Sequence, residues 1–336
     1  MADALQAVAG RRGWIISDGK AGHEAQARGV AEALGLAIEV KRVAPRAPWS
    51  LLSPWGPVAP SEQLGSPASQ FHPPWPDFAF AIGRLTIPYI RKLKQMAGLA
   101  TYTVILLDPK VSAKTADLFW VPEHDKLRGP NVITTLTAPH TFSAARLAEL
   151  RTRVPVEIAA LPTPRVAVLL GGPNGDYQYT PPRVAHLASA LQSLGALRAG
   201  LMITPSRRTP ADVVGFLREQ TAGQRHLFWD GQGENPYPQF LAQADAFVVP
   251  ADSVNMTGEP CATGKPIYVF EPEGGSAKFA RFHDALRRYG ATRSLPARFE
   301  RLETWTYPPL DSASVIAAEV ARRWSKRRHM LGGAGN

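Results

Sequence analysis

Residues 14–23 read WIISDGKAGH, and residues 252–270 read DSVNMTGEPCATGKPIYVF. The first is a short apolar strand that runs through a turn of small residues into a helix, and the second is a small-residue turn followed by an apolar strand. In open α/β sheets, such turns bring backbone N–H groups and a helix N-terminus to the carboxyl end of a parallel strand, where anions bind. Two such turns in one chain predict two doubly wound domains that face each other across a cleft.

Length and composition fit this interpretation. The chain has 336 residues, which favours two domains, and its hydrophobic fraction of 45% is enough to fill two cores. Cys261 is the single cysteine, so no internal disulfide forms and a reducing compartment fits best. The basic residues follow the apolar N-terminal stretch, which is the wrong order for a secretory signal, and no run approaches the roughly 18 apolar residues that span a bilayer. We therefore expect a cytoplasmic protein.

The chain is basic, with a formal net charge of +10 and a sequence pI of about 9.9. This charge indicates either an anionic partner or simply an arginine-rich soluble surface. We expect no nucleic-acid binding, because zinc-finger, K-homology and RNP-type motifs are missing from the sequence. We also expect no metal and no cofactor, because no His/Cys cluster has ligand spacing and Glu123-His124-Asp125 alone is weak.

Strands and helices alternate along both halves of the chain, which predicts parallel pairing and right-handed crossovers. Residues 45–76, rich in Pro, Trp, Gly and Ser, interrupt this pattern and predict a long loop. We expect strands at residues 14–17, 37–43, 78–82, 102–107, 118–121, 131–135, 165–170, 200–204, 226–229, 246–250 and, as the last clear one, 267–270. We expect helices at residues 23–34, 87–96, 182–194, 211–221, 238–243, 276–289 and 311–329.

The domain boundaries follow from Pro162 and Pro164, which mark a linker. We expect a Rossmann-like acceptor-side and membrane-side domain at residues 11–162. A Rossmann-like nucleotide-sugar domain follows at residues 163–308. The last helix, within residues 309–330, is expected to return to the first domain, and its basic end suits the negative pole of the helix dipole.

Two of these motifs resemble those of two-Rossmann (GT-B type) glycosyltransferases, in particular the lipid-linked N-acetylglucosaminyltransferase of peptidoglycan synthesis. Gly22 and His23 match the Gly-His that ends the first glycine-rich turn of those enzymes. Glu259 and the Gly-Lys-Pro at residues 264–266 match their second motif with the same internal spacing.

More closely, the chain resembles, over nearly its full length, the bacterial members of the mitochondrial fission family named for elongated mitochondria. The phrases that carry this resemblance lie at residues 18–23, 171–174, 206–209, 252–256 and 262–266. The plant namesake is associated with organelle division, whereas the bacterial members look like sugar transferases. The resemblance therefore implies the fold and leaves the activity open.

The resemblance implies that the second domain binds a nucleotide-diphosphate sugar. Glycine N–H groups and arginine side chains suit a diphosphate, and the Glu259 carboxylate suits ribose hydroxyls. The alternatives are tight turns without a ligand, a capped helix after Thr209 with solvated arginines, and a solvated Glu259. Because Pro260 follows Glu259, we expect the local helix to start later than in relatives. The candidate nucleotide-sugar residues are Gly171, Gly172, Asn174, Ser206, Arg207, Arg208, Gln232, Asn235, Ser253, Asn255, Met256 and Glu259.

His23 is the best candidate for a general base in the first domain. An inverting transfer needs a base that removes the proton from the acceptor hydroxyl, and imidazole titrates near neutrality. The alternative is that His23 merely caps or packs at the start of its helix, and Asp18, Glu123 and Asp125 are rival carboxylate bases. We take His23 and Asp18 as the catalytic candidates. The acceptor-side candidates are Gly19, Lys20, Gly22, Gly83 and Arg84.

Residues 41–55 mix cations with tryptophan and leucine, from Lys41 to Trp55. Cations suit acidic headgroups and indoles suit the interfacial zone of a bilayer, so this loop favours peripheral contact with the inner face of the cytoplasmic membrane. The alternative is a loop whose tryptophans pack on their own domain. The basic run at residues 322–328 either adds to the membrane contact or is a solvated helix end.

The leading hypothesis is therefore transfer of a sugar from a nucleotide-diphosphate donor to a lipid-linked or cell-envelope acceptor. Two alternatives remain: a membrane-associated scaffold of the division type without catalysis, and a nucleotide-sugar epimerase that needs no acceptor. The donor base, the sugar, the acceptor and the stereochemistry are left open.

Overall fold

The computed structural model describes residues 2–67 and 69–333. The chain divides into two compact units, each with its own sheet. Unit 1 comprises Met1–Thr141 and Asp311–Asn336, and unit 2 comprises Phe142–Leu310.

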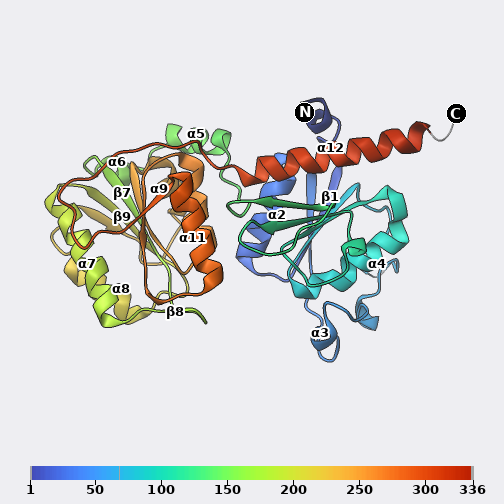
Figure 1. Cartoon of the computed structure of the whole chain (residues 1–336), viewed down its shortest axis with the longest axis horizontal. Helices are drawn as coiled ribbons and strands as arrows, with labels where there is room; N and C mark the ends of the chain where they lie inside the picture. Colours follow the sequence, from blue (N-terminus) through green and yellow to red (C-terminus); the bar gives the residue numbers. More distant parts are fainter. Residues whose placement is uncertain (1, 68, 334–336) are drawn as a thin grey trace. The chain divides into compact units, whose positions relative to one another are not determined.

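Unit 1 is built on a six-stranded sheet in which every pairing is parallel, in the order β2-β1-β3-β4-β5-β6 (Figure 1). The strands are β1 (Arg12–Ser17), β2 (Ala37–Arg42), β3 (Phe78–Ile82), β4 (Tyr102–Leu106), β5 (Leu118–Pro122) and β6 (Val132–Thr135). The helices are α1 (Ala2–Gln6), α2 (Ala21–Ala33), α3 (Trp49–Leu52), α4 (Ile87–Ala97) and α12 (Ser312–Gly333), with 3₁₀ turns η1 (Pro60–Glu62), η2 (Arg84–Thr86), η3 (Gly98–Ala100) and η4 (Ala113–Thr115).

The central strands of this sheet are covered on both faces. All residues of β3, β4 and β5 are buried, which explains why these strands read as continuous apolar runs. Successive side chains of β1 enter opposite cores: Ile15 packs in the cluster that includes α12, and Ile16 packs in the cluster that includes α4. The predicted return of the last helix to the first domain is confirmed, because α12 packs on α1 and α2.

Unit 2 contains a second parallel six-stranded sheet, in the order β10-β9-β7-β11-β12-β14. Its strands are β7 (Arg165–Leu170), β9 (Gly200–Pro205), β10 (His226–Phe228), β11 (Ala246–Pro250), β12 (Ile267–Phe270) and β14 (Thr292–Ser294), and β8 (Tyr177–Gln178) pairs with β13 (Glu273–Gly274) in a separate antiparallel ribbon. Its helices are α5 (Ala144–Thr152), α6 (Val156–Ala159), α7 (Pro181–Ala196), α8 (Ala211–Gln220), α9 (Tyr237–Gln243), α10 (Val254–Gly258) and α11 (Ala277–Tyr289), with the 3₁₀ segment η5 (Glu259–Thr263).

The strand order of unit 2, counted along its own chain, is the 3-2-1-4-5-6 order of a Rossmann sheet. Two α/β units with parallel six-stranded sheets confirm the expected fold class of two Rossmann-like, doubly wound domains. In the 3-2-1-4-5-6 order, successive strands are added outward from the middle of the sheet, first on one side and then on the other. In unit 1, strands are likewise added outward on either side of the boundary between β1 and β3.

The structure differs from the sequence-based expectation in several places. Residues 142–162, expected in the first domain, lie in unit 2, where Arg151 on α5 donates a hydrogen bond to the Ala242 carbonyl. The sheet has one more strand than expected, since the polar residues of β14 pair with β12 at the sheet edge. The expected loop at residues 45–76 contains the short helix α3 and the turn η1.

Around Pro260 the helical segment is divided in two. α10 begins at Val254, directly after the cap residue Ser253, and ends at Gly258. Proline lacks the N–H that a continuing α-helix needs. The chain therefore passes into η5, in which Pro260 lies in the first turn.

Candidate functional site

Each sheet has one switch point, where neighbouring strands lead into connections on opposite sides. It lies between β1 and β3 in unit 1 and between β7 and β11 in unit 2. Open α/β sheets bind ligands at the carboxyl ends of the strands beside such a point. Most of the residues selected from the sequence lie at these two places.

At the switch point of unit 1, Nδ1 of His23 lies 2.9 Å from Oδ1 of Asp18. Asp18 follows β1 and His23 lies in the first turn of α2, so the turn between them brings the two side chains together. Lys20 places its ammonium 3.2 Å from the other carboxylate oxygen of Asp18. The Asp18 side chain is 4% exposed, whereas 23% of the His23 side chain remains accessible.

The charge state of Asp18 defines what His23 can do. Burial alone raises the pKa of Asp18, but the hydrogen bond and charge of His23, together with Lys20, outweigh burial and hold that pKa below its ordinary value. An ionised carboxylate only accepts hydrogen bonds, so Nδ1 of His23 carries the proton. When the ring is neutral, Nε2 is the nitrogen with the free lone pair, as a general base requires.

Gly83, which follows β3 across the switch point, fits closely against this pair. A Cβ atom at Gly83 would lie 2.8 Å from Oδ2 of Asp18 and 3.1 Å from Nδ1 of His23, and its φ of +93° also favours glycine. Gly83, which the sequence analysis placed near His23 and Asp18, therefore lies directly against both side chains in the structure.

The other unit 1 candidates have different surroundings. Gly19 has a φ of +79° in the turn after β1, and Gly22 lies in the first turn of α2. Arg84 donates a hydrogen bond to the Ser53 carbonyl at 2.7 Å, so it supports the loop that carries α3. The rival base Glu123 lies on the exposed segment after β5 and uses its backbone to bind Thr135 and Arg128.

At the switch point of unit 2, the buried carboxylate of Asp252 joins three segments. Oδ2 accepts hydrogen bonds from the backbone N–H of Gly172 at 3.2 Å and from the guanidinium of Arg208 at 2.8 Å. Oδ1 accepts one from the hydroxyl of Tyr179 at 2.6 Å. The Asp252 side chain is 0% exposed, so this carboxylate is fully enclosed by its partners.

The glycines of unit 2 are needed for this close packing. A Cβ at Gly171 would lie 2.2 Å from Oδ1 of Asp252, and one at Gly172 would lie 2.0 Å from the Arg208 carbonyl oxygen. Asn174 donates to the Asp252 carbonyl and accepts from the N–H groups of Asp176 and Tyr177. The structure thus brings Gly171, Gly172, Asn174 and Arg208 together, as the sequence analysis grouped them, around a carboxylate that it did not select.

The neighbouring turns are held by local hydrogen bonds. Ser206 pairs with Thr209, whose hydroxyl also donates to the Gly171 carbonyl, while Arg207 is exposed. Ser253 caps α10 by accepting the N–H of Met256 at 3.3 Å. Asn255 lies next to it in the first turn of α10.

Glu259 is half-buried and accepts a hydrogen bond from the hydroxyl of Tyr237. Burial raises the pKa of Glu259 to about 7, although the Tyr237 hydrogen bond opposes this effect. Glu259 is therefore a carboxyl group that changes its charge near neutral pH.

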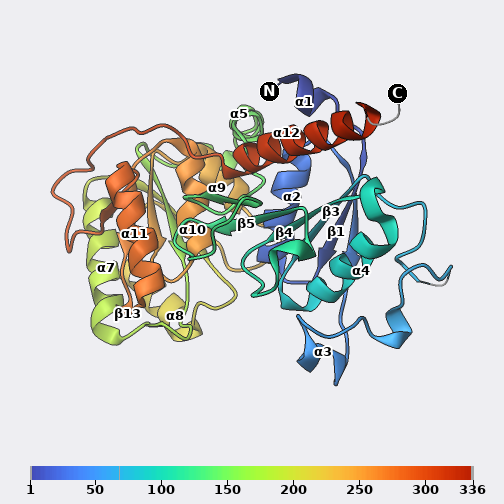
Figure 2. The ribbon, with the colours of Figure 1, turned by 45° about the vertical axis from the view of Figure 1, so that its right-hand side comes forward.

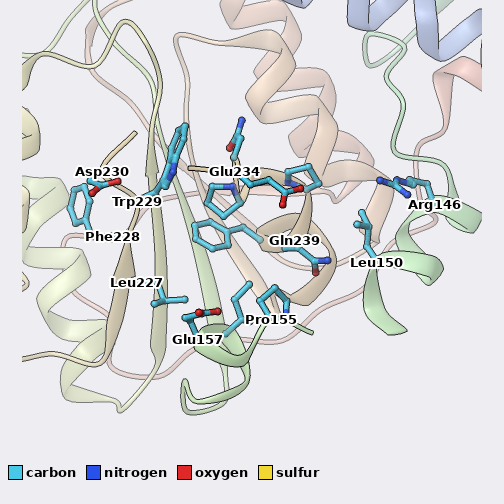
Figure 3. Close-up of a pocket in the computed structure, with 15 residues that line it drawn as sticks. Arg146, Leu150, Pro155, Glu157, Leu227, Phe228, Trp229, Asp230, Glu234 and Gln239 are labelled. Carbon is cyan, nitrogen blue, oxygen red and sulfur yellow. The ribbon is translucent and has the colours of Figure 1, made fainter. Parts of the chain in front are cut away.

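The loop that carries the candidate Asn235 borders a cavity of about 620 Å³ in unit 2 (Figure 3). Asn235 lines it, together with Trp229, Glu234 and Gln239, while leucine and phenylalanine side chains form much of its wall. Gln232 lies outside the lining and accepts the Trp229 indole N–H through its backbone carbonyl at 2.8 Å.

The sequence analysis missed Asp252, Tyr179 and Tyr237 as site residues. Asp252 had a visible signal, because it is a carboxylate two residues after a wholly apolar strand. The two tyrosines had none, since their partners are 73 and 22 residues away in the chain.

The fold and the two switch-point sites define a class of protein: a two-Rossmann, GT-B-like chain with an Asp–His pair in one unit and an enclosed carboxylate network in the other. The Mitochondrial fission ELM1 family matches residues 21–324, and the chain belongs to this family. It is 31% identical to "Mitochondrial fission protein ELM1" of Arabidopsis thaliana over 281 residues, which cover 75% of this chain and 66% of that protein. The match thus spans slightly less than two thirds of the plant protein's length.

Two solved structures show what the fold is similar to. A UDP-GlcNAc 2-epimerase of Methanocaldococcus jannaschii, in complex with UDP-GlcNAc and UDP, matches with a TM-score of 0.51 and 10% identity, covering 94% of this chain and 99% of the epimerase. MurG of Acinetobacter baumannii matches with a TM-score of 0.46 and 13% identity, covering 95% of this chain and 95% of MurG. The likeness to the epimerase supports the fold assignment.

Among residues 2–67 and 69–333, no helix is both long and apolar enough to cross a membrane. Within the same residues, no three His, Cys, Asp or Glu side chains gather in a way that would hold a metal ion.

Proposed function

We propose that this protein transfers a sugar from a nucleotide-diphosphate donor to a hydroxyl of a lipid-linked or cell-envelope acceptor. The observation that carries the proposal is the pairing of His23 Nδ1 with Asp18, because it directs the basic Nε2 away from the carboxylate. A transferase needs such a base to take the proton of the acceptor hydroxyl as the new glycosidic bond forms.

In this proposal unit 2 binds the donor. The enclosed Asp252 fixes the glycine-rich turn of Gly171 and Gly172 beside the arginine-bearing turn after β9. Arg208 is 43% exposed although it pairs with Asp252, so part of its guanidinium remains open to a phosphate. The cavity beside Trp229 and Asn235 offers an aromatic wall for the base, and Glu259 is the ribose partner.

In this proposal the membrane-facing surface lies on unit 1. It consists of Leu51, Leu52 and Trp55, which are 73%, 47% and 68% exposed, on the segment around α3. Arg84 and Arg91 hold the carbonyl groups of residues 53–56, so the segment has a defined shape. Figure 2 shows α3 projecting from the body of its unit.

The structure corrects the role expected for Lys41, the first cation of the loop at residues 41–55. Lys41 is 7% exposed, its ammonium lies over the Trp14 ring at 4.8 Å, and it pairs with Glu39. It therefore cannot reach a headgroup, whereas Arg46, which precedes α3, is exposed. Because Arg84 follows Gly83, the α3 segment and the Asp–His pair are at the same edge of the unit 1 sheet. This proximity favours an acceptor that is presented by a membrane.

The first test is a thermal-shift panel of UDP-, GDP- and ADP-sugars at fixed salt, followed by product analysis. A ligand at about 100 times its Kd stabilises the folded protein by roughly 2.7 kcal/mol. We expect a shift with one nucleotide sugar, its loss in Glu259→Ala, and release of free nucleoside diphosphate only when acceptor-containing membranes are added. A changed sugar without any acceptor would instead identify an epimerase, and no shift with any compound would favour a scaffold.

The second test is sedimentation with vesicles of anionic and of neutral lipid. The triple variant Leu51→Ser, Leu52→Ser, Trp55→Ser should lose most of its binding to anionic vesicles. Val315→Ser is the matched control, because Val315 is 57% exposed on α12 of the same unit. Equal binding by both variants would contradict the membrane contact.

A further inference from the structure

A second cavity of unit 2, of about 400 Å³, lies at the carboxyl edge of its sheet. Ala251, which follows β11, and Glu271, which follows β12, line it on one side. Tyr177 of β8 and the start of α11 complete the wall. The cavity is thus on the same edge of the sheet as the Asp252 network, yet none of the candidate residues from the sequence lines it.

One buried side chain in this cavity is incompletely satisfied. His283, on α11, is 6% exposed, and its Nε2 lies 2.9 Å from the Ala251 carbonyl oxygen. A carbonyl oxygen only accepts, so Nε2 carries the proton. Nδ1 has no hydrogen-bond partner within the part of the chain that the structure describes, residues 2–67 and 69–333.

The ring of His283 is neutral in this setting. Burial lowers the pKa of His283, and the Ala251 hydrogen bond and the Glu271 charge only partly oppose this effect. Nδ1 is therefore a bare lone pair that can only accept. A phosphate oxygen at neutral pH is itself an acceptor, so the group that satisfies Nδ1 is a hydroxyl or an N–H donor.

The start of α11 offers hydrogen-bond donors, in contrast to the acceptor at Nδ1 of His283. Gly274 and Gly275 have φ values of +106° and +113°, and the N–H of Gly275 bonds the Asp176 carbonyl at 2.7 Å, which folds the chain tightly into the helix. Ser276 is the N-cap residue, and its side chain makes no capping hydrogen bond within the described chain. The N–H groups of the first turn are donors at the positive pole of a 13-residue helix, and Arg183 also lines the cavity.

Donors for an anion and an acceptor for a hydroxyl thus line the same cavity. We propose that this cavity holds the sugar of the nucleotide-diphosphate donor, with Nδ1 of His283 accepting a hydrogen bond from a sugar hydroxyl and the start of α11 facing the adjoining phosphate. This inference rests on the proposed function and adds a residue that reads the sugar. His283 is a specificity-determining residue and takes no part in proton transfer.

The matched variant is His283→Gln. A glutamine amide can still donate to the Ala251 carbonyl, as Nε2 does, but it offers nothing at the position of Nδ1. By calorimetry we expect His283→Gln to weaken the binding of the nucleotide sugar about tenfold, the equivalent of one hydrogen bond of about 1.4 kcal/mol. Binding of the parent nucleoside diphosphate, which lacks the sugar, should change less than twofold.

A second measurement does not depend on the nucleotide. In protein labelled with ¹⁵N-histidine, the Nδ1 resonance of His283 should move when glucose 1-phosphate or the nucleotide sugar is added. His226→Gln is the control variant, because His226 lies on β10 and is not among the residues that line the cavity. Its sugar affinity should match that of the wild type.

The outcomes separate the two proposals. Equal affinity of wild type and His283→Gln for a nucleotide sugar that binds, with an unmoved Nδ1 resonance, would overturn the sugar cavity and leave the transferase proposal standing. A resonance that moves with glucose 1-phosphate, when no nucleotide sugar binds, would support the cavity and overturn the transferase. If neither glucose 1-phosphate nor any nucleotide sugar moves the resonance, the cavity proposal is wrong.

Discussion

Nδ1 of His23 lies 2.9 Å from Oδ1 of Asp18, and the carboxylate is almost completely buried while the imidazole is partly accessible. This is the arrangement in which a carboxylate sets the tautomer of a histidine and the histidine does the proton transfer. Asp18 is therefore a positioning residue in the proposed reaction, and His23 is the base.

Asp18→Asn tests this division of roles. The amide keeps the size of the side chain but can donate to Nδ1, which favours the wrong tautomer of His23. With the donor sugar that the panel identifies, we expect kcat to fall by roughly three to four orders of magnitude, with little change in the affinity for the donor. Arg28→Ala removes an exposed ion pair with Glu32 on the same helix and should leave kcat unchanged. Turnover of Asp18→Asn within threefold of the wild type would exclude the pair from the reaction.

Gly83→Ala should disturb the same pair by contact alone. The new methyl group would press on Asp18 and His23, whereas Gly98→Ala places a methyl group with nothing within 4 Å. Both glycines have positive φ, so both variants should lose about 1–3 kcal/mol of unfolding free energy from backbone strain. Only Gly83→Ala should also shift the ¹⁵N resonance of His23 Nδ1. Equal spectra for the two variants would mean that Gly83 is needed only for its backbone.

Asp252→Ala should destabilise unit 2 strongly. The substitution leaves the N–H of Gly172, the Tyr179 hydroxyl and the Arg208 guanidinium without their shared acceptor. Each buried donor left without an acceptor costs about 1–3 kcal/mol, whereas the 43% exposed Arg208 can turn to water, and urea unfolding followed by circular dichroism measures the loss. Glu149→Ala is the control, because its pair with Arg146 is about half exposed and such pairs are worth less than about 1 kcal/mol. Similar losses for both variants would contradict the central role of Asp252.

Much of the fold was predictable from the sequence because buried parallel strands leave a strong local pattern. Phe78–Ile82 and Ala246–Pro250 are continuous apolar runs, and both were recognised. β14 reads Thr-Arg-Ser, and β8 and β13 have two residues each, so no apolar run marks them. Their pairing is set by neighbours that are distant in the chain.

The candidate site likewise contains local features that the sequence predicts and long-range contacts that it does not. Asp18 and His23 are five residues apart, so a turn between a strand and a helix is enough to predict that they are neighbours. The partner of Arg208 lies 44 residues further along the chain. The sequence predicted an arginine free to hold phosphate, whereas tertiary packing gives it a buried carboxylate. His283 carries no local signal, because its significance comes only from the Ala251 carbonyl and the cavity wall.

Glu259 predicts a specific dependence of stability on pH. Its pKa is about 7 in the folded protein and 4.5 without the effects of folding, so the folded state holds a proton that the unfolded state releases first. The contribution of Glu259 is fully present below pH 4.5 and is lost as the pH rises through 7, by an amount on the order of 3 kcal/mol. The measurement is the free energy of unfolding in urea between pH 5 and 8.5 for wild type and Glu259→Gln, whose amide does not titrate. We expect the wild type to lose stability relative to the variant across this range.

Since the Tyr237 hydrogen bond lowers the pKa of Glu259, Tyr237→Phe should move the loss to higher pH. A difference between wild type and Glu259→Gln that stays constant from pH 5 to 8.5 would show that Glu259 is already ionised in the folded protein at pH 5.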